Sequence, residues 1–372
     1  MRMDRVGLRS ATQVDIPLLL VIVAIATAGV VNLYSATSPY IGSTNKGALA
    51  DIYVSQVYWI VVGGLLAVIA ATIDYRFFER YGYVFYLGGI LALLLVFVYG
   101  QNIRGSTRWI LIGSFAFQPS EFMKVPVILV VAKFVHNDSK LESRTLFDLA
   151  VPFALTAVPV ILVMRQPDLG TSLVYSFCAV AILALLRVRL ASILWALLAA
   201  ITTGSLVWTY GMEKYQRLRI TSFLDPEKDI SGAGWHAAQS KTAIGNGGLT
   251  GEGFMQGTQN QFGYMPDQHT DFPFSVFAED WGFLGCLLLL ALYGFLCTWA
   301  VHIAAQAKDR FGAALAVGVG AMVLFHTVAN VGMVLGLLPV VGITLPLFSY
   351  GGSSVVTTMV GLGLLMNVAM RR

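Results

Sequence analysis

Charged residues are scarce in this chain. Asp, Glu, Lys and Arg make up 12% of its 372 residues, whereas a soluble globular domain contains about 25%. A chain so poor in charge cannot cover a water-exposed surface, and this excludes a soluble enzyme, a disordered scaffold and a coiled coil. Apolar residues, by contrast, make up 57%. This composition indicates a protein that crosses a membrane many times.

Cysteine is rarer still. The three cysteines, Cys178, Cys286 and Cys297, lie inside apolar runs, their number is odd, and no CxxC motif occurs. A disulfide framework or a cysteine-based metal site is therefore not expected. A strongly basic composition is also missing, because the net charge is only +4. This bias is too weak to indicate a nucleic-acid partner.

Long apolar runs account for most of the chain. A bilayer core of about 30 Å requires roughly 20 apolar residues per helix. Ten segments suit this length, namely 15–37, 52–73, 82–100, 118–136, 148–164, 169–187, 190–211, 273–303, 310–336 and 342–370. We therefore predict an all-α polytopic membrane protein of about ten transmembrane helices, in which residues 1–372 form a single domain. The first segment is too long for a signal peptide and is expected to remain as an anchor.

The basic residues indicate how the chain is oriented. If the N-terminus is cytoplasmic, the cytoplasmic connections hold Arg2, Arg5, Arg9, Arg76, Arg80, Lys140, Arg144, Arg187, Arg189, Lys308, Arg310, Arg371 and Arg372. The short outer connections then hold only Lys46, Arg104, Arg108 and Arg165. Short loops rich in Lys and Arg stay in the cytoplasm. Both termini are therefore predicted to be cytoplasmic.

One connection, residues 212–272, is far longer than the others and lies outside the cell in this orientation. Long connections in compact proteins are usually functional. This one contains QSKTAIGNGGLTGEG (239–253), where glycine-rich backbone beside Lys241 could cradle phosphate oxygens. The same run also suits a mobile loop without a ligand. No GxxxxGK[ST] motif occurs, so a nucleotide P-loop is not supported.

Two charges interrupt the fourth segment. Glu121 and Lys124 are three residues apart, so they share a helix face and can pair. A charge at the middle of the bilayer costs about 3 kcal/mol on insertion scales, and pairing beside a cavity would reduce that cost. The pair could line a substrate cavity, or it could be a purely structural ion pair, and the sequence supports both interpretations equally. Asp168, before the sixth segment, is interpreted as a helix cap.

A second polar cluster lies where the long loop re-enters the membrane. Asp267, His269 and Asp271 lie close together there, and a partly desolvated acid at this boundary is well placed to act as a general base. The cluster could also bind a metal, but further ligands of a zinc site are not evident. Glu279 and Asp280 follow about two turns later, and one of them is expected to face the bundle interior.

The last segment is irregular, with two prolines and many glycines over residues 330–354. Irregular backbone is not tolerated against lipid, so this break is expected to be buried or to line a cavity. Packing of small residues between helices explains the glycines equally well. Four further histidines show no ligand spacing and are interpreted as ordinary interfacial or core residues: His136, His236, His302 and His326.

Six motifs in order resemble the SEDS family (shape, elongation, division and sporulation), in particular its elongation branch. They are GSTRWI (105–110), QPSEFMK (118–124), QPDLGTS (166–172), QSKTAIGNGGLTGEG (239–253), QHTDFPFSVFAEDWGFLG (268–285) and NVGMVLGLLPVVGITLPLFSYGGSS (330–354). The resemblance covers nearly the whole chain. One departure is DFPF (271–274), where the family commonly has DFIF.

The resemblance implies a ten-helix peptidoglycan glycosyltransferase. Such an enzyme polymerises lipid II, a disaccharide-pentapeptide on undecaprenyl pyrophosphate, at the outer face of the bacterial cytoplasmic membrane. It implies a class B penicillin-binding protein as the transpeptidase partner, other membrane proteins of the elongation complex, and a divalent cation, Mg²⁺ or Mn²⁺, with unknown ligands. The family's essential aspartate falls on Asp271, its motif tryptophan on Trp109, and the acid and base of QPSExxK on Glu121 and Lys124.

The chemistry of these residues suits that substrate. A groove between helices would admit the lipid tail, and Arg104, Arg108, Lys241 or a cation would meet the diphosphate. We therefore predict one catalytic residue, Asp271, whose carboxylate could act as a base or ligate a metal. The predicted substrate-binding residues are Arg108, Trp109, Glu121, Lys124 and Lys241.

Two other functions compete with the enzyme. A transporter or flippase of the same lipid would use intramembrane polar residues, but it requires such residues on both sides of the membrane. A non-catalytic scaffold would only activate a penicillin-binding protein. The polar residues gather on the predicted outer side, which favours the glycosyltransferase.

Overall fold

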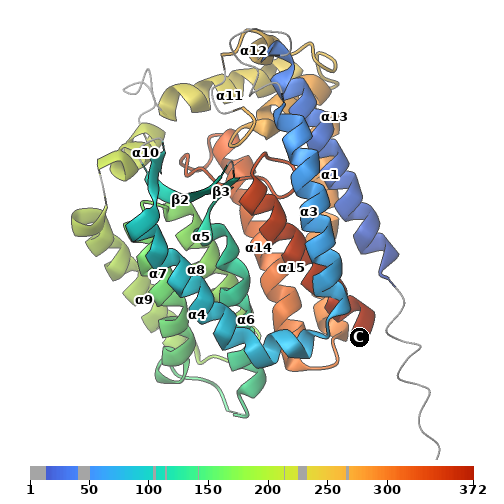
Figure 1. Cartoon of the computed structure of the whole chain (residues 1–372). Helices are drawn as coiled ribbons and strands as arrows, with labels where there is room; N and C mark the ends of the chain where they lie inside the picture. Colours follow the sequence, from blue (N-terminus) through green and yellow to red (C-terminus); the bar gives the residue numbers. More distant parts are fainter. Residues whose placement is uncertain are drawn as a thin grey trace, which may run out of the picture.

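Helices form most of the computed structural model of the chain (Figure 1). It describes residues 14–40, 51–103, 106–113, 115–140, 142–212, 214–224, 233–264 and 268–372. Within these ranges, eight helical spans are long and apolar enough to cross a membrane. They are built on α1 (Ile16–Thr37), α3 (Ile52–Thr72), α4 (Tyr75–Tyr99), α7 (Ala150–Arg165), α9 (Leu190–Leu206), α13 (Pro273–Gln306), α14 (Arg310–Val334) and α15 (Gly352–Arg371).

Shorter helices occupy the two remaining predicted segments. These are α5 (Pro119–Phe122) with α6 (Lys124–Asn137), and α8 (Leu169–Leu183). Short turns extend three helices, namely η1 (Ser38–Tyr40) after α1, η2 (Phe147–Leu149) before α7, and the π-helical η3 (Val207–Gly211) after α9. The predicted all-α polytopic membrane fold is thus confirmed.

Aspartates set the start of several helices. The carboxylates of Asp15, Asp74, Asp168 and Asp309 each accept a backbone N–H from the first turn of α1, α4, α8 and α14. Such caps satisfy donors that have no partner within the helix. The interpretation of Asp168 as a cap is therefore correct. The helix that contains the third predicted segment, 82–100, begins earlier, at Tyr75, because Asp74 caps α4 there.

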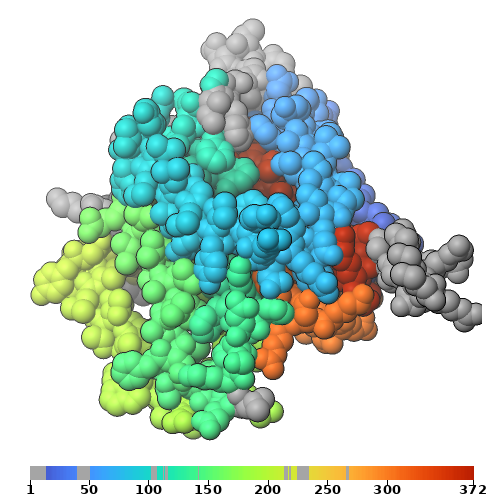
Figure 2. Space-filling model, turned by 60° about the horizontal axis from the view of Figure 1, so that its bottom comes forward, coloured from blue at the N-terminus to red at the C-terminus, as the bar shows by residue number. Residues whose placement is uncertain are grey.

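The centre of the bundle is formed by α14 and α15, most of whose residues are buried. α15 packs closely on α3, because a Cβ at Gly363 would collide with the backbone of Ala67. Small residues such as glycine let two helix backbones approach each other closely. Figure 2 shows the red α15 in a furrow between the blue α3 and the cyan α4. By contrast, α9 buries only Ser192 and lies at the edge of the bundle (Figure 1).

The tenth predicted segment, 342–370, is helical only in its second part. The chain leaves α14 at Val334 and enters α15 at Gly352, and we call residues 335–351 the break. Pro339 and Pro346 lie in the break, where proline lacks the N–H that a helix needs. As expected, the second part of the break is buried, with Leu345, Leu347 and Phe348 almost inaccessible to solvent. In its first part, by contrast, Leu335, Leu337 and Leu338 are exposed.

Side chains from three helices satisfy the backbone of the break. Gln56 Nε2 donates to the carbonyl of Ser349 at 3.0 Å, Asn330 Nδ2 to that of Ile343 at 2.7 Å, and the Tyr293 hydroxyl to that of Pro346 at 2.6 Å. Irregular backbone at this depth survives only with such partners.

The eighth predicted segment also differs from a continuous helix, because α13 is broken at Gly282, where φ is 64° and ψ is −165°. The glycine-rich run 239–253 forms backbone hydrogen bonds with the interrupted part of α13. Glu252 N donates to the carbonyl of Glu279 at 2.9 Å, and Phe283 N donates to that of Gly248 at 2.9 Å. A Cβ at Gly251 would collide with the carbonyl of Asp280. Gly248 and Gly251 are therefore held against α13.

The long loop contains three helices that the sequence did not predict: α10 (Lys214–Leu224), α11 (Ala233–Gly247) and α12 (Thr258–Gln261). α11 and α12 lie across the end of the bundle opposite to the end of α15 (Figure 1), and we call this the α11 end. A small antiparallel sheet, also unpredicted, precedes α5. Its strands run in the order β1 (Gln101–Ile103), β2 (Ser106–Ile112) and β3 (Phe115–Phe117).

The opposite end carries the basic connections. Arg144 Nε pairs with Asp138 at 2.7 Å, and Arg310 NH1 donates to the carbonyl of Asp138 at 2.8 Å. The Arg144 guanidinium holds the pKa of Asp138 below its ordinary value. At the same end, Arg372 NH2 pairs with the α1 cap, Asp15, at 2.9 Å. The start of α1 and the end of α15 thus lie on one side, in agreement with an even number of crossings.

Cysteine labelling tests the predicted orientation. In a chain whose three cysteines are replaced by serine, we introduce Thr250→Cys or Glu142→Cys, since both positions are exposed. A membrane-impermeant maleimide should label position 250 in intact cells and position 142 only after the membrane is opened. The reverse pattern would overturn the orientation.

Candidate active site

A cavity of about 540 Å³ lies toward the α11 end of the bundle. Its walls come from β2, α5, α8, α10, α14, the break and the residues just before α13. Trp59 of α3 and Ser353 of α15 also line it, so the cavity shares walls with the furrow in Figure 2. The cavity brings together four of the predicted site residues: Arg108, Trp109, Glu121 and Asp271.

Asp271 reaches the cavity because the chain turns there into α13. Pro273 is the first residue of α13, a position where the missing N–H costs nothing. The backbone carbonyl of Asp271 accepts from Asn330 Nδ2 at 2.9 Å, the same amide that holds Ile343 in the break. One buried asparagine of α14 thus fixes the aspartate relative to the break.

Gly342 leaves room beside the Asp271 carboxylate. Its φ is +71°, and a Cβ built there would lie 3.5 Å from Asp271 Oδ2 and 3.7 Å from Arg219 NH1. A carboxylate and a guanidinium therefore flank the same point of the break. Arg219, on α10, was missed by the sequence analysis, because nothing in a long polar loop marks one arginine among others.

Arg108 is held by the aspartate that caps α8. Arg108 NH1 lies 3.4 Å from Asp168 Oδ1, and Asp168 also accepts from Thr171 N at 3.2 Å and from Gln118 Nε2 at 3.3 Å. Asp168 is therefore both a cap and an anchor for Arg108. The Arg108 side chain is 19% exposed and lines the cavity, so its guanidinium remains accessible to a bound ligand.

Glu121 and Lys124 form the predicted pair, with Lys124 Nζ 2.6 Å from Glu121 Oε2. Lys124 Nζ also lies 2.9 Å from Nε2 of His326 on α14, and His326 Nδ1 lies 2.9 Å from the carbonyl of Thr344 in the break. A carbonyl can only accept, so Nδ1 carries the proton and Nε2 accepts from the ammonium group. All three side chains are buried.

His326 is a cavity residue that the sequence analysis took for an ordinary core histidine. It lines the cavity together with Glu121, and it joins the ion pair to the break. Its contact with Lys124 spans 202 positions of the chain, so no local spacing could have revealed it.

The other predicted residues lie elsewhere. Lys241, on α11, lies in a second and smaller pocket beside Arg219. Arg104 and Asp267 fall outside the described residues. In the part of the chain that the structure describes, no group of three His, Cys, Asp or Glu side chains could hold a metal ion.

Glu279 and Asp280 are both buried, not only one of them. Glu279 accepts the backbone N–H groups of Gln259 and Asn260 at 2.9 and 3.3 Å, at the start of α12. Asp280 accepts from the hydroxyl of Ser35 at the end of α1. These acids attach the long loop to the bundle and do not line the cavity.

Comparison with known proteins identifies related sequences. Residues 16–372 match the FtsW, RodA and SpoVE family, described as cell cycle proteins. The peptidoglycan glycosyltransferase MrdB of Escherichia coli (strain K12) is 38% identical over 96% of this chain and 94% of its own length. The peptidoglycan glycosyltransferase RodA of Treponema pallidum (strain Nichols) is 32% identical over 98% of this chain and 99% of its own length.

Solved structures share the fold. One chain, from work on how a peptidoglycan synthase complex coordinates polymerization and crosslinking, superposes with a TM-score of 0.81 at 32% identity, covering 97% of this chain and 99% of that chain. The rod shape determining protein RodA of Thermus thermophilus superposes with a TM-score of 0.70 at 30% identity, covering 97% of this chain and 98% of that chain.

A double-mutant comparison tests the coupling of Glu121 and Lys124. Removing one charge leaves the other buried and unpaired, which costs roughly 3–5 kcal/mol. Glu121→Gln and Lys124→Met should therefore each lower the free energy of unfolding more than the double variant does. Lys308→Met, at an exposed lysine, is the control and should change stability little. Additive losses would show that the two residues do not interact.

Proposed function

The chain belongs to the FtsW/RodA/SpoVE (SEDS) family and is a RodA/MrdB-like peptidoglycan glycosyltransferase, and we propose that it polymerises lipid II with Asp271 as the general base. The observation that supports this role is the position of Asp271 on the cavity wall at the α11 end, where Arg219 flanks the same glycine, Gly342, and Arg108 lines the same cavity. Two of its relatives are peptidoglycan glycosyltransferases, which favours an enzyme over a transporter or a scaffold.

The reaction needs one proton acceptor. The C4 hydroxyl of the acceptor sugar attacks the anomeric carbon of the donor, and the bond from that carbon to the diphosphate oxygen breaks. The hydroxyl proton passes to the Asp271 carboxylate, and the leaving diphosphate keeps the bond's electron pair. A sugar hydroxyl is a poor nucleophile until a base takes its proton, whereas a diphosphate leaves without protonation if cations neutralise its charge. Direct attack inverts the anomeric carbon.

The cavity offers the environments that a lipid-linked sugar requires. We infer that the lipid tail follows the furrow between α3 and α4 (Figure 2), and that the disaccharide enters the cavity beside Trp109. Arg108 lines the cavity with a partly exposed side chain and can donate to a diphosphate. The pair Glu121–Lys124, held by His326, gives the wall a fixed hydrogen-bonding surface. In this assignment the α11 end faces the outside of the cytoplasmic membrane.

A divalent cation, Mg²⁺ or Mn²⁺, suits this site only in part. Asp168 and Glu121 are paired with cationic side chains, so the described residues offer no cluster of carboxylates. Mg²⁺ commonly binds through one or two carboxylates and substrate phosphates. We propose that Asp271 would offer one oxygen to the cation, which would supply charge neutralisation at the diphosphate, and would keep the other oxygen for the proton.

Asp271→Asn tests the assignment of the base. The variant keeps the size of the side chain and removes its basic oxygen, so polymerisation of labelled lipid II by the purified protein should fall by about 10²–10⁴. Its thermal unfolding and expression should stay near those of the unchanged protein. Asp267→Asn, four positions earlier in the same loop, is the matched control. If that variant is inactive while Asp271→Asn polymerises normally, the assignment is wrong.

We further propose that the chain works beside a class B penicillin-binding protein, a single-pass transpeptidase, together with other membrane proteins of the elongation complex. The support is that a chain of the same fold belongs to a peptidoglycan synthase complex. Glycan strands become a wall only when they are crosslinked, so polymerisation and crosslinking are more efficient when the two enzymes lie side by side.

Co-purification tests this partner. Affinity purification of the tagged chain from detergent-solubilised membranes should enrich a class B penicillin-binding protein. An unrelated single-pass membrane protein of similar abundance is the control and should not be enriched. A chain that is always isolated alone and is fully active would contradict the proposal.

A further inference from the structure

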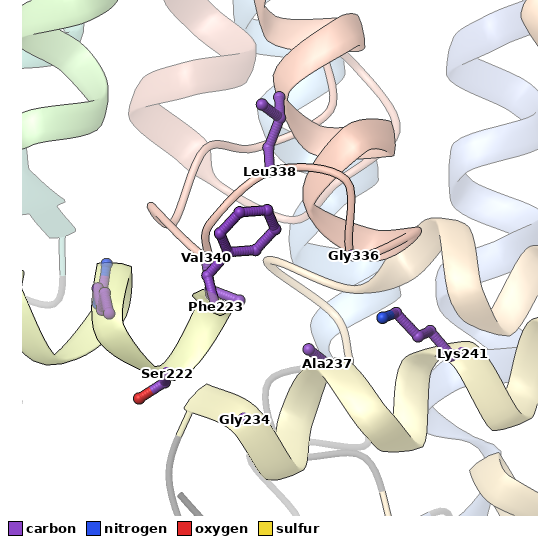
Figure 3. A pocket seen from close by; sticks show the side chains of 9 residues that line it. Ser222, Phe223, Gly234, Ala237, Lys241, Gly336, Leu338 and Val340 are labelled. Atoms are coloured by element: carbon purple, nitrogen blue, oxygen red, sulfur yellow. The ribbon is translucent and has the colours of Figure 1, made fainter. Parts of the chain in front are cut away.

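A second pocket adjoins the active-site cavity at the α11 end. It lies between α10, α11 and the start of the break, and its volume is about 30 Å³. Figure 3 shows Lys241 extending from α11 toward Gly336, with Phe223, Leu338 and Val340 grouped nearby. A water needs about 10–15 Å³ of such space. The pocket can therefore receive a few phosphate oxygens but not a sugar ring.

The walls of this pocket are cationic on one side and apolar on the other. Arg219 and Lys241 line it, and no acid is among its described lining residues. The apolar walls suit the hydrocarbon that follows the diphosphate of a lipid carrier. Mixed walls of this kind match a lipid diphosphate better than a free anion.

Gly336 makes room for the Lys241 side chain. Its φ is +66°, and a Cβ there would collide with Lys241 Cε and lie 2.5 Å from its Nζ. Lys241 is largely exposed, and no hydrogen bond or ion pair joins it to another residue that the structure describes. Its ammonium group is therefore available to a ligand that enters beside the break.

Arg219 connects this pocket to the reaction centre. It lines both the small pocket and the cavity, and its NH1 and Asp271 Oδ2 flank the same glycine, Gly342. Arg108, by contrast, lines only the cavity. Arg108 in the cavity and Lys241 in the small pocket thus provide cations in two different parts of the site. A reaction between two lipid-linked diphosphates requires such a division.

We propose that the small pocket binds the diphosphate of the donor, the group that leaves. This inference rests on the proposed function and assigns one of its two diphosphates to Arg219 and Lys241. When the acceptor hydroxyl attacks, the bond between the anomeric carbon and the phosphate oxygen breaks, and the diphosphate gains that bond's electron pair. The proton goes to Asp271, while the two cations neutralise the new charge of the diphosphate.

Binding of undecaprenyl diphosphate, which carries no sugar, tests the pocket directly. The full chain in lipid nanodiscs is titrated with this lipid, and with undecaprenol to measure binding of the tail alone. Arg219→Gln and Lys241→Gln should each weaken diphosphate binding by about tenfold, since each removes one charge-assisted contact. Lys241→Arg keeps the charge and should retain most of the affinity.

One control variant separates this pocket from general surface charge. Arg217→Gln removes a cation from α10 that lines neither pocket, and it should bind undecaprenyl diphosphate like the unchanged protein. Unchanged affinity in the Arg219 and Lys241 variants, or an equal loss in Arg217→Gln, would overturn the proposal.

Polymerisation of lipid II, measured on the same preparations, separates this proposal from the function on which it rests. If the chain makes glycan but undecaprenyl diphosphate binding is insensitive to Arg219 and Lys241, only the pocket assignment fails. If binding depends on both cations but no glycan forms, the pocket is a lipid diphosphate site and the proposed function fails.

Discussion

The structure depends on satisfying the backbone of an interrupted helix inside the bundle. Between α14 and α15 the chain runs without helix from residue 335 to 351, at a depth where unpaired peptide groups are costly. Gln56, Tyr293 and Asn330 supply the missing partners. Because these donors come from α3, α13 and α14, the break holds three helices at fixed positions, and the space beside it becomes a cavity rather than a packed core.

The same break positions the polar groups of the site. Asn330 joins it to the backbone of Asp271, and His326 joins it to the pair of Glu121 and Lys124. The charges that line the cavity are therefore anchored before any substrate binds. Preorganised charges stabilise a reacting group more effectively than groups that must first reorient, because no reorganisation is needed at the moment of reaction.

Both pockets lie along the break, on either side of Arg219. Gly342 borders the cavity and Gly336 borders the small pocket, and both have positive φ. At each position the missing side chain leaves space for a functional group, the Asp271 carboxylate or the Lys241 ammonium. Two glycines of the run that suggested a phosphate cradle, Gly247 and Gly251, pack on the interrupted α13. Glycine content alone therefore did not locate the ligand site.

The sequence by itself determined the membrane class, nearly all the crossing helices, the ion pair of Glu121 and Lys124, and the cap at Asp168. These features depend on hydropathy or on spacings of a few residues, which are local. It also indicated that the segment with two prolines would be buried or line a cavity, because lipid admits no irregular backbone, and residues 342–354 do so. Only the tertiary structure decided that Asp168 anchors Arg108, that His326 completes the ion pair, and that Arg219 lies beside Asp271. These contacts join residues from distant elements, and their geometry is set by how the helices pack around the break, which no local pattern encodes.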